Sequence, residues 1–224
     1  GTSSIAFDGN DSLSAPDSSD WDFSGEFTIE SWVRFTSISN TNDFIGTSNN
    51  AAYLGSSKSG WVLSYFSGGG GGSARFNWSY QSDNSWIFEN EFDVDSSLST
   101  DTWYQVAISR DSSDDVRLFL GGVQQDATIN NTTALVTTEG LYVGAGYNNT
   151  SVALDGYMDE VRISDTARYT SGFTPSTTQF TADANTLLLI HSDFDGGLGA
   201  DSSGNENDFA VTNLVATDQM VDSP

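Results

Sequence analysis

The sequence contains no cysteine and only one histidine among its 224 residues. The absence of cysteine excludes disulfide scaffolds, thiolate nucleophiles and zinc held by thiolates. A Ser-His-Asp triad would have to use His191, which directly follows the apolar run 187–190 and is typical of a structural histidine at the end of a buried strand. Nucleophilic catalysis of these kinds is therefore disfavoured.

Basic residues are also scarce, with 7 Lys and Arg against 31 Asp and Glu and a formal net charge of −24. A field of this sign repels phosphate backbones and anionic lipid surfaces, which argues against nucleic-acid partners. No segment approaches the roughly 18–20 apolar residues that span a bilayer, so we expect no membrane insertion. Neutral ligands and divalent cations remain open as ligand classes.

Apolar residues recur at every second position rather than at helical spacing. In the stretch 27–35, for example, Phe27, Ile29, Val33 and Phe35 share one face of a strand. The same alternation returns in the stretches 104–108, 116–120, 141–143 and 157–163. Clusters of Gly, Asn, Asp and Ser, which are typical of turns, separate these stretches. The pattern predicts an all-β fold, an antiparallel two-sheet jelly-roll sandwich.

Two other segments qualify this plan. The stretch 165–169 predicts one short helix, and the glycines at 68–72 predict a hairpin tip rather than a phosphate-binding loop, because no Lys and no helical pattern follow them.

Past residue 175 the composition turns to Thr, Asp and Asn around one apolar strand. About fifty such residues without cysteine rarely fold alone. We therefore expect a domain over residues 1–175 and a C-terminal extension, 176–224, that packs on the same sandwich.

Three stretches together resemble the laminin G-like, concanavalin A-type jelly-roll family of lectins and glucanases. They are residues 5–33, with Ile-Ala-Phe-Asp-Gly and Phe-Thr-Ile-Glu-Ser-Trp-Val; residues 102–122, with Thr-Trp-Tyr-Gln-Val-Ala-Ile; and residues 154–169, with Leu-Asp-Gly-Tyr-Met-Asp-Glu-Val-Arg-Ile. Their order and spacing are specific. The resemblance covers residues 1 to about 175 and implies a concanavalin A-like sandwich.

A shorter segment, Asp-Ser-Ser-Gly-Asn-Glu-Asn-Asp-Phe at residues 201–209, resembles a segment of marine bacteriophage tail and virion-surface proteins that carry this module. This resemblance implies display on a virion surface or outside a cell. The partners would then be a host-surface glycan or glycoprotein and other virion proteins, and a homo-oligomer is left open.

The family resemblance also implies a structural calcium ion where the first strand meets the last. The matching positions are Asp8, Asp155 and Asp159. Asp155 and Asp159 share one strand face if no bulge intervenes. Calcium prefers carboxylate and carbonyl oxygens, but acidic loops also satisfy themselves through backbone amides, so both interpretations stay open.

Sugar recognition needs flat aromatic faces and a few amide or carboxylate groups. Such groups occur at two or three places along the chain, and the candidate carbohydrate-binding residues are Trp61, Trp78, Tyr80, Trp86, Tyr147 and Asn148. Aromatic residues in a sandwich core give the same pattern, so each ring is either a core residue or a binding platform. We expect one or two of them to be surface platforms.

Glu89, Glu91, Asp93 and Asp95 alternate along one strand and are the strongest indication of catalysis. Retaining glycosidases use two carboxylates about 5–5.5 Å apart, and some jelly-roll glucanases present three acids at alternate positions. Here the series ends in Asp rather than Glu, which favours a solvated acidic strand face, with a second cation site as the next interpretation.

The sequence therefore predicts a non-enzymatic, calcium-stabilised recognition module that binds host-surface carbohydrate. A purely structural virion decoration or assembly domain remains an alternative, as does a degenerate glycan hydrolase that uses Glu91, Asp93 and Asp95. Family membership alone cannot choose among these functions.

Overall fold

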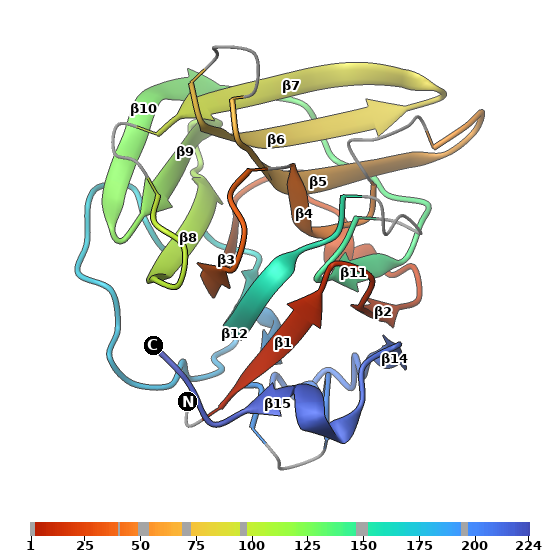
Figure 1. Cartoon of the computed structure of the whole chain (residues 1–224). Coiled ribbons are helices and arrows are strands. Elements are labelled where there is room, and N and C mark those ends of the chain that lie inside the picture. The colour runs from red at the N-terminus through yellow and green to blue at the C-terminus, as the bar shows by residue number, and fades with distance from the viewer. Residues whose placement is uncertain are drawn as a thin grey trace.

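The computed structural model describes residues 3–39, 41–48, 54–68, 73–94, 98–146, 152–193 and 197–224. They form two antiparallel sheets packed face to face (Figure 1). The predicted all-β sandwich is confirmed.

One sheet has eight strands. They are β1 (Ser4–Asp8), β3 (Phe27–Phe35), β8 (Trp103–Arg110), β9 (Asp115–Leu120), β10 (Val123–Asn130), β12 (Asp155–Ser164), β13 (Thr186–Ile190) and β15 (Gln219–Met220). The strand order is β10-β9-β8-β3-β12-β1-β15, and β13 also pairs with β12. Because β1 pairs with the first half of β12 and β13 with the second half, β1 and β13 follow one another along the same side of β12.

The other sheet has seven strands in the order β14-β2-β11-β4-β5-β6-β7. They are β2 (Ser12–Ala15), β4 (Asn42–Gly46), β5 (Ser59–Phe66), β6 (Arg75–Ser82), β7 (Ser85–Asp93), β11 (Leu141–Val143) and β14 (Ala210–Thr212). Helical structure in the described ranges is limited to two three-residue 3₁₀ turns, η1 (Ser19–Trp21) and η2 (Ala216–Asp218). Within those ranges no helix has the length and apolar character needed to cross a membrane.

Two hairpins show how turn residues set the strand pairing. Asp83 and Asn84 join β6 to β7 with φ angles of 48° and 62°, and Gly121 and Gly122 join β9 to β10 with φ angles of 57° and 78°. Two consecutive positive φ angles are what a tight two-residue hairpin needs. Gly122 is also required sterically, since a Cβ there would lie 2.0 Å from the carbonyl oxygen of Phe173.

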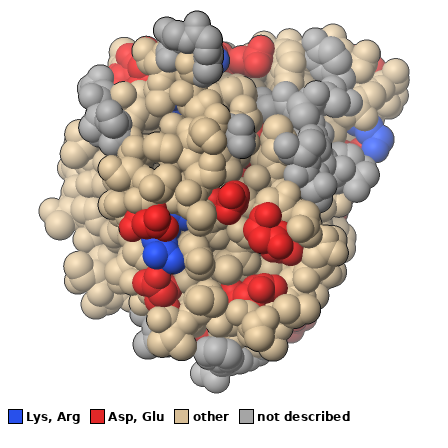
Figure 2. Space-filling model, viewed as in Figure 1, with Lys and Arg blue, Asp and Glu red and all other residues tan. Residues whose placement is uncertain are grey.

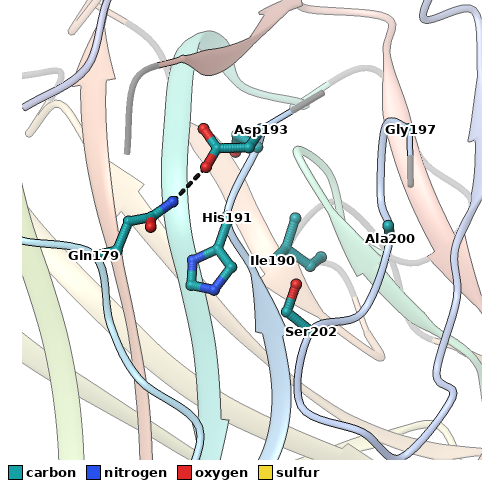
Figure 3. A pocket seen from close by; sticks show the side chains of 8 residues that line it. Gln179, Ile190, His191, Asp193, Gly197, Ala200 and Ser202 are labelled. Atoms are coloured by element: carbon teal, nitrogen blue, oxygen red, sulfur yellow. Dashed lines mark hydrogen bonds between the residues drawn. The ribbon is translucent and has the colours of Figure 1, made fainter. Parts of the chain in front are cut away.

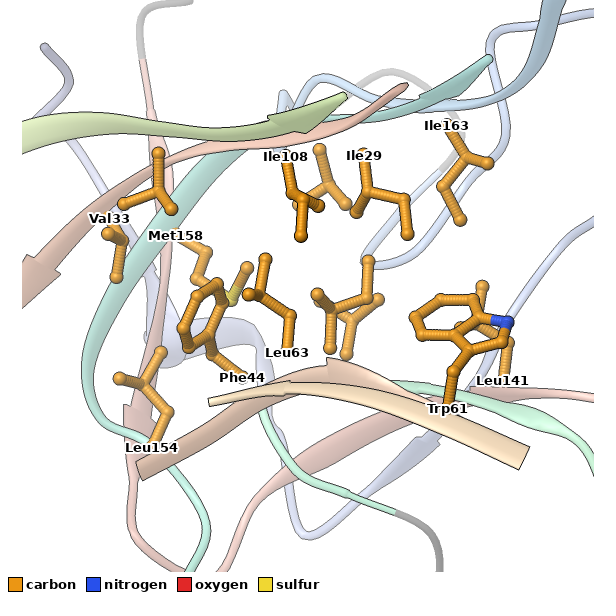
Figure 4. Close-up of a cluster of buried hydrophobic side chains, with 14 of the residues drawn as sticks. Ile29, Val33, Phe44, Trp61, Leu63, Ile108, Leu141, Leu154, Met158 and Ile163 are labelled. Carbon is orange, nitrogen blue, oxygen red and sulfur yellow. The ribbon is translucent and has the colours of Figure 1, made fainter. Parts of the chain in front are cut away.

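The core fills the space between the two sheets (Figure 4). Ile29 and Val33 of β3 and Ile108 of β8 point from the eight-stranded sheet toward Leu63 and Trp61 of β5. All five side chains are buried. The alternate positions along each strand thus supply one apolar face per sheet, which is the arrangement that the alternation in the sequence predicts.

Residues past 175 belong to both sheets. Strand β13 pairs with β12, β14 pairs with β2, and β15 pairs with β1. Figure 1 shows the two ends of the chain close to the edge made by β1 and β15. The C-terminal segment therefore contributes strands to the sandwich rather than forming a body of its own.

The short helix predicted at 165–169 is wrong, because this segment has no helical hydrogen bonding. Its polar groups bond to the outer face of the eight-stranded sheet instead: the Arg168 amide donates to Thr28 Oγ1 at 2.8 Å, and the Tyr169 hydroxyl donates to Glu30 at 2.8 Å. Tertiary hydrogen bonds replace the local ones that a helix would need.

Candidate functional site

A polar pocket of about 220 Å³ opens where β13 ends (Figure 3). It is lined by Gln179, Ile190, His191, Ser192, Asp193, Gly197, Ala200 and Ser202. The lining comes from three parts of the chain: the segment before β13, the end of β13, and the loop that follows. Because β13 pairs with β12 along the sheet, the pocket has one rigid wall.

His191 is fixed in this wall by the buried carboxylate of Glu160. Its Nδ1 atom lies 3.1 Å from both carboxylate oxygens, and the Phe180 amide donates to Glu160 Oε2 at 2.7 Å. Glu160 raises the pKa of His191 through this contact, while partial burial of the ring opposes the rise. The contact matches the structural histidine that the sequence indicates, yet the ring also borders the pocket.

A β-bulge explains how Glu160 reaches the histidine. The pairing of β12 with β3 shifts between Asp159 and Arg162, and Glu160 adopts a φ angle of 53°. A bulge of this kind re-aims a side chain out of the regular alternation. Asp159, which precedes it, is fully buried, and burial first and Glu160 second raise the pKa of Asp159 to about 7.

The opposite rim of the pocket carries an amide and a second carboxylate. The Gln179 side-chain amide donates to Asp193 Oδ2, while the Ser3 hydroxyl lies 3.1 Å from Asp193 Oδ1 and 2.7 Å from the Ser192 carbonyl oxygen. Among the pocket residues drawn in Figure 3, a hydrogen bond joins Gln179 to Asp193, and none joins Ser202 to His191. The described residues that line the pocket offer donors and acceptors for hydroxyl groups.

The three predicted calcium ligands do not converge. Asp8 and Asp155 face each other in the pairing of β1 with β12, but Asp159 lies four positions farther along β12, about 13 Å away at strand geometry. Asp8 is exposed and Asp159 is buried. Across the described ranges, no group of three acidic or histidine side chains is arranged to hold a metal ion. The geometry therefore does not fit one ion bound by all three carboxylates, and calcium binding itself stays a prediction.

Three of the predicted sugar-binding rings are core residues. Trp61 and Trp78 are fully buried with ring centroids 5.2 Å apart, and Tyr80 is 6% exposed. Because Trp61 packs on Phe23, Trp78 on Phe27 and Tyr80 on Phe88 in the interior, these rings are not binding platforms, which corrects their assignment. The sequence could not decide this, since alternation identifies a strand face but not what covers it.

The remaining sugar-binding candidates lie elsewhere. Trp86 is half-buried near the start of the edge strand β7, away from its core-facing positions Phe88 and Phe92. Tyr147 and Asn148 fall outside the described residues. The sequence did not identify the pocket at the end of β13, because its side chains come from positions 179 to 202 without any common motif.

The acidic strand face behaves as the favoured interpretation expects. Glu89, Glu91 and Asp93 are exposed on β7, and Glu91 pairs with Arg75 at 2.8 Å. Asp95 falls outside the described residues.

The sequence of the chain matches one known protein family. Residues 7–171 match the family model of the concanavalin A-like lectin/glucanases superfamily. No curated protein matches the chain in sequence.

Solved structures share the fold at low identity. A Bacteroides ovatus protein proposed to bind carbohydrate is 19% identical with a TM-score of 0.68, over 96% of this chain and 60% of its own length. Domain 4 of AbnA, an extracellular arabinanase from Geobacillus stearothermophilus solved with arabinotriose, is 16% identical with a TM-score of 0.53, over 73% of this chain and 71% of its own. Mouse laminin alpha1 domains LG4-5 are 12% identical with a TM-score of 0.51, over 81% and 48%.

Proposed function

This chain belongs to the concanavalin A-like lectin/glucanase superfamily, and from that premise we propose that it is a non-enzymatic module that binds carbohydrate. We place the sugar in the pocket at the end of β13. The observation that carries the proposal is the convergence of the Gln179 amide, the His191 ring and the Asp193 carboxylate on one open polar pocket. Such a set of donors and acceptors suits the hydroxyl groups of a sugar ring.

The charge of the chain restricts the ligand of this pocket to a neutral sugar. The net charge is −24, and acidic side chains outnumber basic ones on the face shown in Figure 2. The Asp193 carboxylate lines the pocket itself, and the buried Glu160 carboxylate lies behind His191. An anionic sugar would meet repulsion here, whereas a neutral hydroxyl can donate to Asp193.

Solved structures that share the fold and are described with carbohydrate support carbohydrate binding as the class of function. Domain 4 of AbnA was solved with arabinotriose, and the Bacteroides ovatus protein is proposed to bind carbohydrate. This chain spans 60% of the latter protein, so the activity of a longer relative does not transfer to it. Display on a phage particle or cell exterior, and a host-surface glycan as the partner, rest on the sequence resemblances alone.

The test is calorimetric titration with neutral oligosaccharides, chosen after a glycan array. Asp193→Asn should weaken binding about tenfold, because it removes a charged acceptor for a sugar hydroxyl. Asp93→Asn is the matched control, since it makes the same chemical change on the exposed face of β7. Equal affinities of both variants would exclude the pocket as the site, and a silent array would favour the assembly role.

The hydrolase alternative has a separate test. Incubation with soluble polysaccharides should release no reducing ends above background. Release that disappears in Glu91→Gln would instead establish a hydrolase that uses the β7 face, and the non-enzymatic proposal would fail.

A further inference from the structure

An arginine stands between two aromatic rings on the outer face of the eight-stranded sheet. Arg34 of β3 is the register partner of Trp103 on β8 and of Tyr157 on β12. Its guanidinium carbon lies 3.9 Å from the Tyr157 ring centroid and 5.6 Å from that of Trp103. Both rings are partly exposed. Three neighbouring strands thus hold a cation in a fixed orientation between two aromatic faces, which we call the Arg34 cradle.

A carboxylate of the same chain occupies the cradle. Asp222, beyond β15, reaches Arg34 Nη2 with its Oδ2 atom at 2.9 Å. The Asp222 side chain is 43% exposed, and its neighbour Val221 is 87% exposed, so this part of the tail has few contacts of its own. An ion pair this exposed adds little to stability.

Asp222 leaves two N–H donors of the Arg34 cradle without a hydrogen-bond partner. Within the described residues, Arg34 Nε and Trp103 Nε1 are buried and have no hydrogen-bond partner. A carboxylate that binds arginine well engages two parallel N–H groups at once, whereas Asp222 lies at Nη2 and leaves Nε without a partner. A carboxylate free to choose its angle would therefore fit Arg34 better than the tail does.

We propose that the Arg34 cradle is a second binding site, for the carboxylate of an acidic sugar residue such as a uronate, and that Asp222 is its built-in competitor. The aromatic faces favour a sugar over other carboxylates, because a pyranose ring presents C–H groups that pack on Tyr157 or Trp103 while its carboxylate meets Arg34. The net charge opposes anions at long range, but salt screens it beyond about 8 Å at physiological ionic strength. The site is separate from the pocket at the end of β13.

The test is a titration of the ¹⁵N-labelled full chain with sodium glucuronate, followed through the Arg34 Nε–H and Trp103 Nε1–H signals. Both signals should shift saturably, and Asp222→Asn should tighten the apparent dissociation constant by about threefold or more, because it removes an intramolecular competitor. Glu206→Gln, which removes an exposed charge in the same C-terminal segment, is the matched control and should leave the constant unchanged.

Arg34→Lys keeps the charge but cannot form two parallel hydrogen bonds, so it should weaken binding while the chain stays folded. No saturable shift, or no gain in Asp222→Asn, would overturn the site. Equal binding of N-acetylaspartate amide would overturn the sugar assignment in favour of an acidic peptide. Glucose should not move either signal, so failure here is distinguishable from failure of neutral-sugar binding in the pocket.

Discussion

The buried carboxylate of Glu30 accepts two hydrogen bonds from the Arg162 guanidinium, from Nη2 at 2.6 Å and from Nε at 2.8 Å. The two residues are register partners on β3 and β12. Glu30 also accepts from the Gln105 amide at 2.7 Å and from the Tyr169 hydroxyl at 2.8 Å. Burial, and then the nearby Glu30 charge, raise the pKa of Tyr169, so its hydroxyl keeps the proton that it donates. This carboxylate therefore ties the segment after β12 to the outer face of the sheet.

Replacing Glu30 should be costly. Glu30→Gln leaves the Arg162 charge buried without its counter-charge, and we expect a loss of about 3–5 kcal/mol in the free energy of unfolding. Urea denaturation followed by fluorescence measures it. The control is Lys58→Gln, which breaks the Lys58–Glu139 pair whose lysine is 40% exposed. That change should cost less than about 1 kcal/mol. Similar losses in the free energy of unfolding in both variants would show that burial does not increase the contribution of the Glu30–Arg162 pair to stability.

The raised pKa of the buried Asp159 carboxyl predicts that the contribution of this residue to the stability of the fold decreases as the pH rises. Its pKa is raised by burial from 3.8 to about 7 in the folded chain, so the folded state holds a proton that the unfolded state releases. The contribution of Asp159 to stability should therefore decrease between about pH 4 and about pH 7 and then level off. Asp159→Asn should flatten this decrease, and urea denaturation at about pH 4.5 and about pH 7.5 measures the change. A decrease of unchanged size in Asp159→Asn would contradict the assignment.

His191 acts in the same direction over a higher pH range. Glu160 raises the pKa of the folded histidine above 6.5, so protonation stabilises the fold fully below the unfolded pKa, and the gain is lost as the pH passes the folded pKa. His191→Gln should lower the melting temperature at about pH 5.5 and have a smaller effect at about pH 8.5. The control is Gln124→Ala on β10, where an effect independent of pH is expected.

Trp61 should behave as a core residue and not as a ligand platform. Trp61→Ala removes a fully buried ring together with the hydrogen bond from its Nε1 to the Trp21 carbonyl oxygen at 2.8 Å. A loss of about 3–5 kcal/mol is expected. Trp61→Phe should keep the affinity for neutral sugar unchanged, as measured by calorimetry. The matched exposed control is Ile87→Ala on β7, where the side chain is 50% exposed. Loss of sugar affinity in a folded Trp61→Phe variant would restore the platform hypothesis.

Calcium can be tested by thermal unfolding in EDTA and then in millimolar calcium. An ion that binds only the folded state should raise the midpoint. Because Asp159 lies apart from Asp8 and Asp155, any rise should survive Asp159→Asn and be reduced in Asp155→Asn. A rise lost in Asp159→Asn would contradict the geometry, and no rise at all would remove calcium from the account of this chain.

The fold could be predicted from the sequence because each strand has a local pattern of apolar residues at every second position. Phe27, Ile29, Val33 and Phe35 are spaced so that they share one face of a strand, and all four are buried in the core. The family resemblance over residues 1–175 is likewise confirmed by the match over residues 7–171. Both signals depend on residues that are close together along the chain or that keep a fixed spacing.

The candidate site could not be predicted in the same way, because it depends on contacts between residues that are distant in the sequence. The bulge at Glu160 and its contact with His191, 31 positions away, arise from the pairing of β12 with β3 and β13. Trp78 and Trp86 both occupy strand positions, but the register of β6 with β7 shifts next to Trp86, so that Trp78 is buried while Trp86 is partly exposed. Tertiary packing therefore settles which of the sequence candidates can meet a ligand.

The pairing of β1 with β15 also bears on how the chain folds. Ser4 pairs with Met220, so this edge of the eight-stranded sheet joins residues from opposite ends of the described chain. During synthesis β1 must wait for β12 and then for β15 before its two sides are paired. Contacts between residues so distant in sequence slow folding, because the loop between them must close first. In a growing chain, this edge of the sheet at β1 therefore stays unpaired until β15 has been synthesised.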